Sequence, residues 1–181
     1  MVPAVVTVAG IFLLPAIVLT GGPVLPFLSA VLLHELGHLL GGILTGTPVR
    51  RFGAGILGLH LDFAMERVSY RQEFWVLVAG SLFGLFTLLW IPDPAYRTCA
   101  LGLNLANLLP VTGLDGGGIL SCFLHRITDG DRADRICHMV SLAAGILFWR
   151  AGMWSVLRVG PNPTWMLCGM AMAAGEIRSK R

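Results

Sequence analysis

The apolar stretch 24-VLPFLSAVLLHELGHLLGGIL-44 contains the motif His34-Glu35-Leu36-Gly37-His38 near its centre. The stretch is long enough to cross a bilayer as one helix, which takes about 20 residues. Side chains four positions apart project from the same face of a helix, so the imidazoles of His34 and His38 can bind one metal ion. Glu35 lies beside the first histidine, where its carboxylate can take a proton from a water molecule at that metal. The motif therefore predicts a metal-dependent hydrolytic site inside a membrane helix.

The charge of Glu35 argues against an incidental match to this motif. A carboxylate near the middle of a membrane helix costs about 2.5–3.5 kcal/mol on insertion scales. A structural role would require a buried cationic partner, and residues 24–44 contain no Lys or Arg. One alternative stays open, a membrane protein that binds or transports metal ions, because intramembrane His, Asp and Asn also mark ion pathways. A second alternative is a catalytically inactive membrane protein that binds or retains membrane partners. Such a protein would be expected to lack one of the metal ligands or the carboxylate that takes the proton.

Composition indicates an integral membrane protein. Of the 181 residues, 55% are hydrophobic and only 13% are charged, and the mean hydropathy is +0.76; these values exclude an ordinary soluble domain. The length suits one transmembrane domain, residues 1–181, with about six spans of about 20 residues each. The net charge of +3 comes from basic residues scattered among loops, which predicts no nucleic-acid partner. The four cysteines lack C-x-x-C spacing and fit small buried apolar residues.

The predicted fold is an all-α membrane protein of about six transmembrane helices, with a short β-hairpin at the membrane face between helices 2 and 3. The hairpin is expected within residues 49–73, where glycines would weaken a helix by about 1 kcal/mol each. A connector without regular structure is the alternative. An edge strand of this hairpin, around Gly53 to Phe63, would hold a substrate extended. The expected spans are residues 2–19, 24–44, 74–91, 98–109, 136–157 and 163–174.

A polar turn follows the fourth expected span. Pro110 breaks the helix, and the glycine-rich residues 111–118 cannot continue it. Irregular backbone at membrane depth is tolerated only where protein or a water-filled cavity covers it, so Asp115 is placed where its carboxylate can reach the metal. His34, His38 and Asp115 would then leave a fourth position open, as in catalytic zinc sites.

Two asparagines precede this turn. Asn107 lies about two helical turns before Asp115, and its amide can donate to a substrate carbonyl or a developing oxyanion. A hydrogen bond between helices is an equally good interpretation of Asn107. Asn104 is expected to be such an interhelical link.

Basic residues predict the orientation in the membrane. Most Lys and Arg side chains follow the second, fourth and sixth expected spans, which places them on one face. The positive-inside rule makes that face cytoplasmic, so both termini of the multi-pass protein are expected in the cytoplasm. These residues are Arg50, Arg51, Arg67, Arg71, Arg126, Arg132, Arg135, Arg178, Lys180 and Arg181.

The paired motifs resemble those of a known family. H-E-L-G-H in a membrane span, followed by Asn107-Leu-Leu-Pro110 and then Leu114-Asp115-Gly116-Gly117, is similar to the site-2 protease family of intramembrane zinc metalloproteases. The resemblance covers the catalytic core, about residues 24–124. The small six-span layout resembles most closely the branch that processes sigma-factor precursors during bacterial sporulation.

The resemblance implies a function and a set of partners. The protein would hydrolyse peptide bonds in transmembrane or membrane-proximal segments of membrane proteins, releasing for example a sigma or transcription factor. Zn²⁺ would be held by His34, His38 and Asp115, with Glu35 as general base and Asn107 as the asparagine of the second motif. The expected partners are a membrane-protein substrate, the lipid bilayer of the bacterial cell membrane, and membrane proteins that regulate or inhibit cleavage. Homo-oligomerisation is left open.

The chain departs from the family pattern at four positions. Gly113 stands where the family often has proline, and Gly118 stands where it often has arginine. On the third span, Gly80 matches the glycine of the family's A-G-P-x-x-N segment, while Ser81 and Gly84 replace its proline and asparagine. None of these differences removes a predicted ligand.

Overall fold

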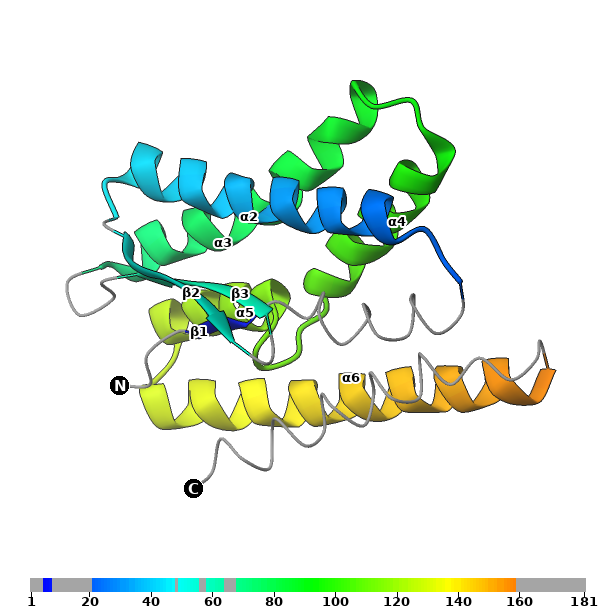
Figure 1. Cartoon of the computed structure of the whole chain (residues 1–181). Coiled ribbons are helices and arrows are strands. Elements are labelled where there is room, and N and C mark those ends of the chain that lie inside the picture. The colour runs from blue at the N-terminus through cyan, green and yellow to red at the C-terminus, as the bar shows by residue number, and fades with distance from the viewer. Residues whose placement is uncertain (1–4, 8–20, 48, 56–57, 64–67, 159–181) are drawn as a thin grey trace.

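The computed structural model describes residues 5–7, 21–47, 49–55, 58–63 and 68–158, which form helices and a small sheet (Figure 1). Three of these helices are long and apolar enough to cross a membrane: Val24–Thr45, Tyr70–Leu89 and Gly130–Trp154. The elements in chain order are strand β1 (Val5–Thr7), helix α2 (Val24–Thr45), strands β2 (Val49–Gly55) and β3 (Gly58–Phe63), helix α3 (Tyr70–Phe86), 3-10 helix η2 (Thr87–Leu89), and helices α4 (Pro94–Asn107), α5 (Asp115–Ile127) and α6 (Gly130–Arg158).

Local sequence sets the ends of the helices that carry the polar motifs. Helix α2 ends at Gly46, whose left-handed backbone (φ 69°) lets its N–H bond carbonyls of the preceding turn. The N-cap residue of helix α3 is Ser69, which forms a capping box with Gln72. Helix α4 begins after Asp93, whose carboxylate accepts the Tyr96 N–H at 2.7 Å. Each helix therefore starts or stops at a residue type suited to that place.

Helix α2 packs on both α3 and α4, while α3 packs on α5 and α5 packs on α6 (Figure 1). The backbones of α2 and α3 approach closely, because a Cβ on Gly37 would lie only 2.6 Å from the Ala79 carbonyl oxygen. A buried apolar cluster fills the space between α2 and α4. It consists of Phe27, Ala30, Val31, Tyr96, Ala100 and Leu103.

Helix α2 has its polar groups inside and apolar groups outside. His34, Glu35 and His38 are buried, whereas Leu32 and Leu44 are 57% and 86% exposed. Ionisable residues of membrane helices face the interior of the bundle, and the outer surface meets lipid. Together with the three candidate spans, this arrangement is that of an integral membrane protein, as the composition predicted.

The predicted fold class is wrong. The chain is not all-α, because β1, β2 and β3 form a three-stranded antiparallel sheet in the order β1-β3-β2. The two strands of the expected lone hairpin, β2 and β3, belong to this sheet, and its third strand is Val5–Thr7, part of the expected first span. The sequence could not indicate this strand, because a short apolar run has no periodicity that separates a strand from a buried helix. The described residues do not show six spans either, since three of their helices are long and apolar enough to cross a membrane. Helix α4 has only 14 residues, and the expected sixth span, 163–174, lies outside the described residues.

The sheet order decides which strand of the expected hairpin lies at an edge. Strand β3 contains Leu59 and Leu61 and pairs with β1 on one side and β2 on the other. Its backbone hydrogen-bonding groups are therefore used within the sheet. Strand β3 is therefore the central strand, and the strand of the expected hairpin that lies at an edge of the sheet is β2.

Candidate metal centre

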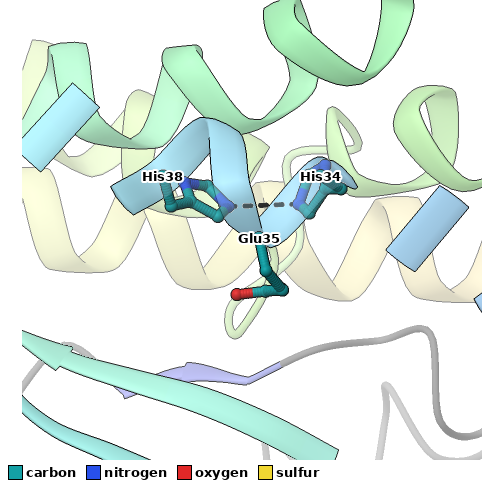
Figure 2. Close-up of side chains that lie close together, drawn as sticks. All are labelled: His34, Glu35 and His38. Carbon is teal, nitrogen blue, oxygen red and sulfur yellow. Dashed lines mark hydrogen bonds between the residues drawn. The ribbon is translucent and has the colours of Figure 1, made fainter. Parts of the chain in front are cut away.

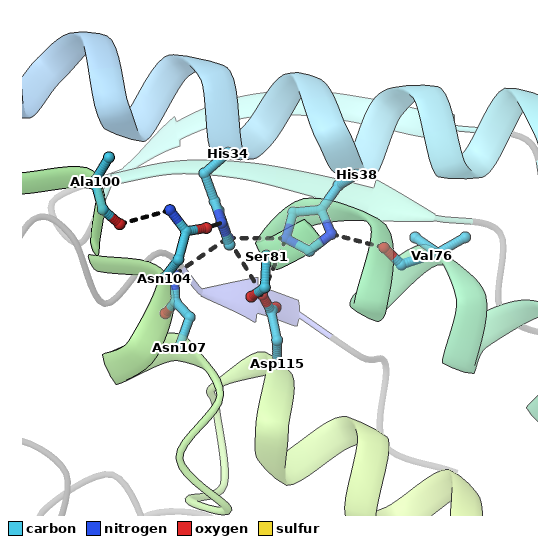
Figure 3. A network of polar contacts seen from close by, with 8 residues as sticks. All are labelled: His34, His38, Val76, Ser81, Ala100, Asn104, Asn107 and Asp115. Atoms are coloured by element: carbon cyan, nitrogen blue, oxygen red, sulfur yellow. Dashed lines mark hydrogen bonds and ion pairs between the residues drawn. The ribbon is translucent and has the colours of Figure 1, made fainter. Parts of the chain in front are cut away.

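Three predicted ligands converge at one point (Figure 3). His34 and His38 project from α2 and Asp115 begins α5, and their exposed fractions are 2%, 0% and 3%. The Nε2 atoms of the two histidines lie 3.1 Å apart. Oδ2 of Asp115 lies 3.2 Å from Nε2 of His34 and 3.3 Å from Nε2 of His38. The structure thus brings together side chains that are far apart in the sequence.

The backbone of α3 holds the ring of His38. Its Nδ1–H donates to the Val76 carbonyl oxygen at 2.9 Å, since a carbonyl can only accept. The ring also lies directly against Gly80, where a Cβ would collide with it and come 2.7 Å from Nδ1. The position of His38 therefore requires a residue without a side chain at position 80.

A side chain of α4 holds the ring of His34 (Figure 3). Nδ1 of His34 lies 2.9 Å from Oδ1 of Asn104, and the Asn104 amide nitrogen donates to the Ala100 carbonyl at 2.7 Å. The second bond identifies Oδ1 as the atom that faces His34, and an oxygen acceptor requires the hydrogen on Nδ1. The predicted interhelical link through Asn104 is therefore present, and it ends on a predicted metal ligand.

These hydrogen bonds leave three acceptor atoms facing one another. With hydrogen on Nδ1, each histidine has a lone pair on Nε2, and Oδ2 of Asp115 is an acceptor as well. Acceptors at this distance repel unless a proton or a cation lies between them. Imidazole and carboxylate ligands suit zinc, and ligands bound at about 2.0–2.1 Å in a tetrahedron stand about 3.3 Å apart. The separations of 3.1, 3.2 and 3.3 Å fit such an ion.

Glu35 is buried beside this cluster at 5% exposure, and neither of its carboxyl oxygens has a hydrogen-bond partner. Burying a carboxyl group without a partner is costly, which favours a functional role. Figure 2 shows its side chain leaving α2 toward the part of the view occupied by the strands. The potential ligand atoms of His34, Glu35 and His38 lie within 4.8 Å of one another, a looser set than the one completed by Asp115. This geometry favours Asp115 as third ligand and leaves Glu35 available for proton transfer.

Two further polar side chains border the cluster. Nδ2 of Asn107 lies 3.1 Å from Nε2 of His34, so its amide reaches the cluster, and the contact is also the hydrogen bond between helices that was the other interpretation of Asn107. Oγ of Ser81 lies 3.5 Å from Oδ2 of Asp115, a long contact. From the sequence, Ser81 was only a small residue of the third expected span and a departure from the family pattern, although it directly follows the glycine that the ring of His38 requires. For Asn104 the available signal was its spacing of three residues from Asn107, which puts both amides on one face of α4.

A tight turn delivers Asp115 to the site. Gly113 has a φ of 89°, a left-handed conformation that proline cannot adopt. The family's proline would therefore not fit this backbone, which accounts for one departure from the family pattern. The Leu114 N–H closes the turn on the Val111 carbonyl at 3.0 Å. Asp115 follows in the first turn of α5, where the helix N-terminus favours a negative charge.

Sequence comparison relates the chain to a known protein. No model of a known protein family matches the sequence. Over 149 residues the chain is 29% identical to a protein of Synechocystis sp. (strain ATCC 27184 / PCC 6803 / Kazusa) that is provisionally named a zinc metalloprotease. The match covers 74% of this chain and 39% of that protein. The chain therefore spans about two fifths of the length of the curated relative it matches.

Structural comparison gives a broader match. The fold is similar to that of a site-2 protease from Methanocaldococcus jannaschii, with a TM-score of 0.64 and 20% sequence identity, over 94% of this chain and 87% of that one. Neither likeness concerns sporulation, so that branch stays a prediction. The chain has the fold of a site-2 protease, and the predicted resemblance to that family is confirmed.

Proposed function

We propose that this protein is an intramembrane zinc metalloprotease that hydrolyses peptide bonds in transmembrane or membrane-proximal segments of membrane proteins. One observation carries the proposal: two imidazole nitrogens and a carboxylate oxygen meet within 3.3 Å beside a buried carboxyl group that has no partner. The likeness to a provisionally named zinc metalloprotease and to a site-2 protease fold supports it. The proposed catalytic core is residues 24–124 within a single domain, residues 1–181.

His34, His38 and Asp115 would hold the metal through the three atoms that face one another. Two histidines and one carboxylate leave a fourth position for water or substrate, which is the pattern of catalytic rather than structural zinc. When bound, zinc supplies Lewis-acid polarisation of a water molecule and of the substrate carbonyl. The chain itself supplies an enclosed site: all three ligands are at most 3% exposed, which keeps bulk water away from their charges.

Glu35 acts as the general base and then as the general acid. Its carboxylate accepts a proton from the attacking water as the new C–O bond forms at the peptide carbonyl. It returns that proton to the amide nitrogen as the C–N bond breaks, so the products are a carboxylic acid and an amine. Because neither oxygen of Glu35 is held by a hydrogen bond, its carboxyl group is free to turn between water and leaving group.

Asn107 stabilises the developing oxyanion. Its amide nitrogen lies 3.1 Å from Nε2 of His34, at the border of the position where a substrate carbonyl must sit. An amide N–H aimed at the place where negative charge develops lowers the barrier more than it strengthens substrate binding. Asn107 therefore contributes to turnover and leaves metal affinity to the three ligands.

The membrane setting completes the proposal. The substrate is a membrane protein whose helix must unwind locally, since a membrane helix keeps its peptide groups in intrahelical hydrogen bonds. The protein lies in the bacterial cell membrane with both termini in the cytoplasm. Membrane proteins that regulate cleavage, a second copy of the chain and a sigma-factor precursor as substrate belong to the proposal as partners. The alternative of metal transport gains no support from the matched proteins.

A paired assay of wild type and Glu35→Gln tests the proposal. Both proteins are purified in detergent, their zinc is measured by elemental analysis, and each is incubated with a panel of single-span membrane substrates. We expect about one zinc per chain in both, because Gln spares the three ligands, and cleavage by the wild type alone. Zinc in both proteins without cleavage by either would contradict the protease, and absence of zinc from the wild type would contradict the ligand set.

A further inference from the structure

The amide of Asn104 occupies a space that exists because position 84 has no side chain. Asn104 is completely buried on α4, and Gly84 faces it from α3. A Cβ built on Gly84 would collide with the amide group, coming 2.7 Å from Cγ of Asn104. Under 3.0 Å something must shift, and the amide is the group that would be displaced.

The orientation of this amide is fixed at both ends. Its nitrogen donates to the Ala100 carbonyl at 2.7 Å, so its oxygen faces Nδ1 of His34 at 2.9 Å. That oxygen can only accept, and it therefore selects the histidine tautomer with hydrogen on Nδ1. The lone pair of His34 is then on Nε2, the atom that faces His38 and Asp115.

We propose that Asn104 is the positioning residue for His34, and that Gly84 provides the space in which it does so. This inference rests on the proposed function, because it treats His34 as a metal ligand. Asn104 contacts neither the proposed metal position nor a substrate; it acts through the far nitrogen of the ring. A histidine ligand whose other N–H donates to a fixed acceptor is held in one tautomer and one orientation.

Asn104 and Asn107 therefore have separate tasks on one helix. Asn104 meets Nδ1 of His34, whereas Asn107 meets Nε2 of the same ring. Without Asn104, the ring of His34 can rotate, or its hydrogen can move from Nδ1 to Nε2. In both states the lone pair of Nε2 no longer faces the metal position. Loss of such outer partners lowers metal affinity by about 10–100-fold.

The test measures zinc affinity by competition with a chromophoric chelator, and the visible absorption of the cobalt(II)-substituted protein as a report of coordination geometry. Asn104→Ala should weaken zinc binding by about 10–100-fold and alter the cobalt spectrum. Asn104→Asp keeps an acceptor for Nδ1, although it loses the donor to the Ala100 carbonyl, and should therefore retain more zinc affinity than Asn104→Ala. Leu103→Ala is the matched control, since Leu103 is buried on the same helix in the apolar cluster and should lower thermal stability alone.

Gly84→Ala provides a second route that deletes no polar group. The new Cβ displaces the Asn104 amide, so this variant should also weaken zinc binding. In the Asn104→Ala background the same change should have little further effect, because the group it displaces is gone. This pair decides the matter even where Asn104→Ala alone does not fold.

Three results would overturn the inference: wild-type zinc affinity in Asn104→Ala or Gly84→Ala, equal losses in Asn104→Asp and Asn104→Ala, or an equal loss in Leu103→Ala. The proposed function has its own readout in the same series. A wild type that binds zinc and cleaves substrate while Asn104→Ala matches it removes only the inference. A wild type that binds no zinc removes the proposed function and the inference together.

Discussion

The two histidines of the site reach the same point with different support. On the α3 side, His38 is held by a main-chain carbonyl, that of Val76, and by the open space above Gly80. On the α4 side, His34 is held by the side chain of Asn104. A hydrogen bond from a histidine ring to a main-chain carbonyl survives most substitutions and is lost only when a larger side chain displaces the ring. A hydrogen bond to a side chain is lost as soon as that side chain is removed. The two sides of the site should therefore respond to opposite kinds of mutation.

Adding one methyl group on the α3 side should have the largest effect. In Gly80→Ala the new Cβ collides with the ring of His38, which must leave its place between Val76 and Asp115. A misplacement of about 1 Å can cost a factor of 10² in rate, and here a ligand itself moves, so we expect zinc and cleavage both to be lost. Zinc content and substrate cleavage are the measurements. Gly102→Ala is the control, because a Cβ there meets nothing within 4 Å.

Deleting an amide on the α4 side should separate turnover from metal binding. Asn107→Ala should lower kcat by about 10²–10³-fold, the usual cost of one oxyanion donor, and should leave zinc content unchanged. Single-turnover cleavage and elemental analysis check this. Leu105→Ala, at a 54% exposed position of the same helix, serves as control. Loss of zinc from Asn107→Ala would instead mean that Asn107 also helps to position the ring of His34.

The smallest effect is expected at Ser81, which links α3 to the third ligand. The acceptor is the Asp115 carboxylate, but the contact with its Oδ2 is long, 3.5 Å, so we expect a net contribution of about 1 kcal/mol, below the usual range for hydrogen bonds to charged groups. Ser81→Ala should therefore weaken zinc binding by no more than about fivefold, as measured by chelator competition. A loss as large as that of Gly80→Ala would mean that Ser81 positions Asp115 in a way the distance does not suggest.

The sequence was most informative where geometry is local. The spacing of His34 and His38 on one helix determines how their rings can meet, and the structure brings these rings together. The partner of each ring could not be predicted in this way, because it depends on how α3 and α4 are rotated against α2. For Asn104 the sequence therefore predicted only a hydrogen bond between helices. Gly84 could be interpreted from the sequence only as a small residue that lets another helix approach and as a departure from the family pattern; its contact with the Asn104 amide is visible only in the structure.

The fold class was the weaker prediction. The residues around Val5–Thr7 are apolar apart from Thr7, and such a run suits a buried strand and a membrane helix equally. Pairing with β3 decides between the two, and that pairing joins segments more than fifty residues apart in the chain. The order of the three strands has the same origin, which is why the central position of β3 could not be predicted from its glycine pattern.

X-ray absorption at the zinc edge of the purified wild type is the most direct test of the central claim, that His34, His38 and Asp115 hold the metal. The account predicts scattering from two imidazole rings and from oxygen or nitrogen ligands at about 2.0–2.1 Å, with no sulfur ligand. A sulfur shell at about 2.3 Å, or fewer than two imidazoles, would contradict it.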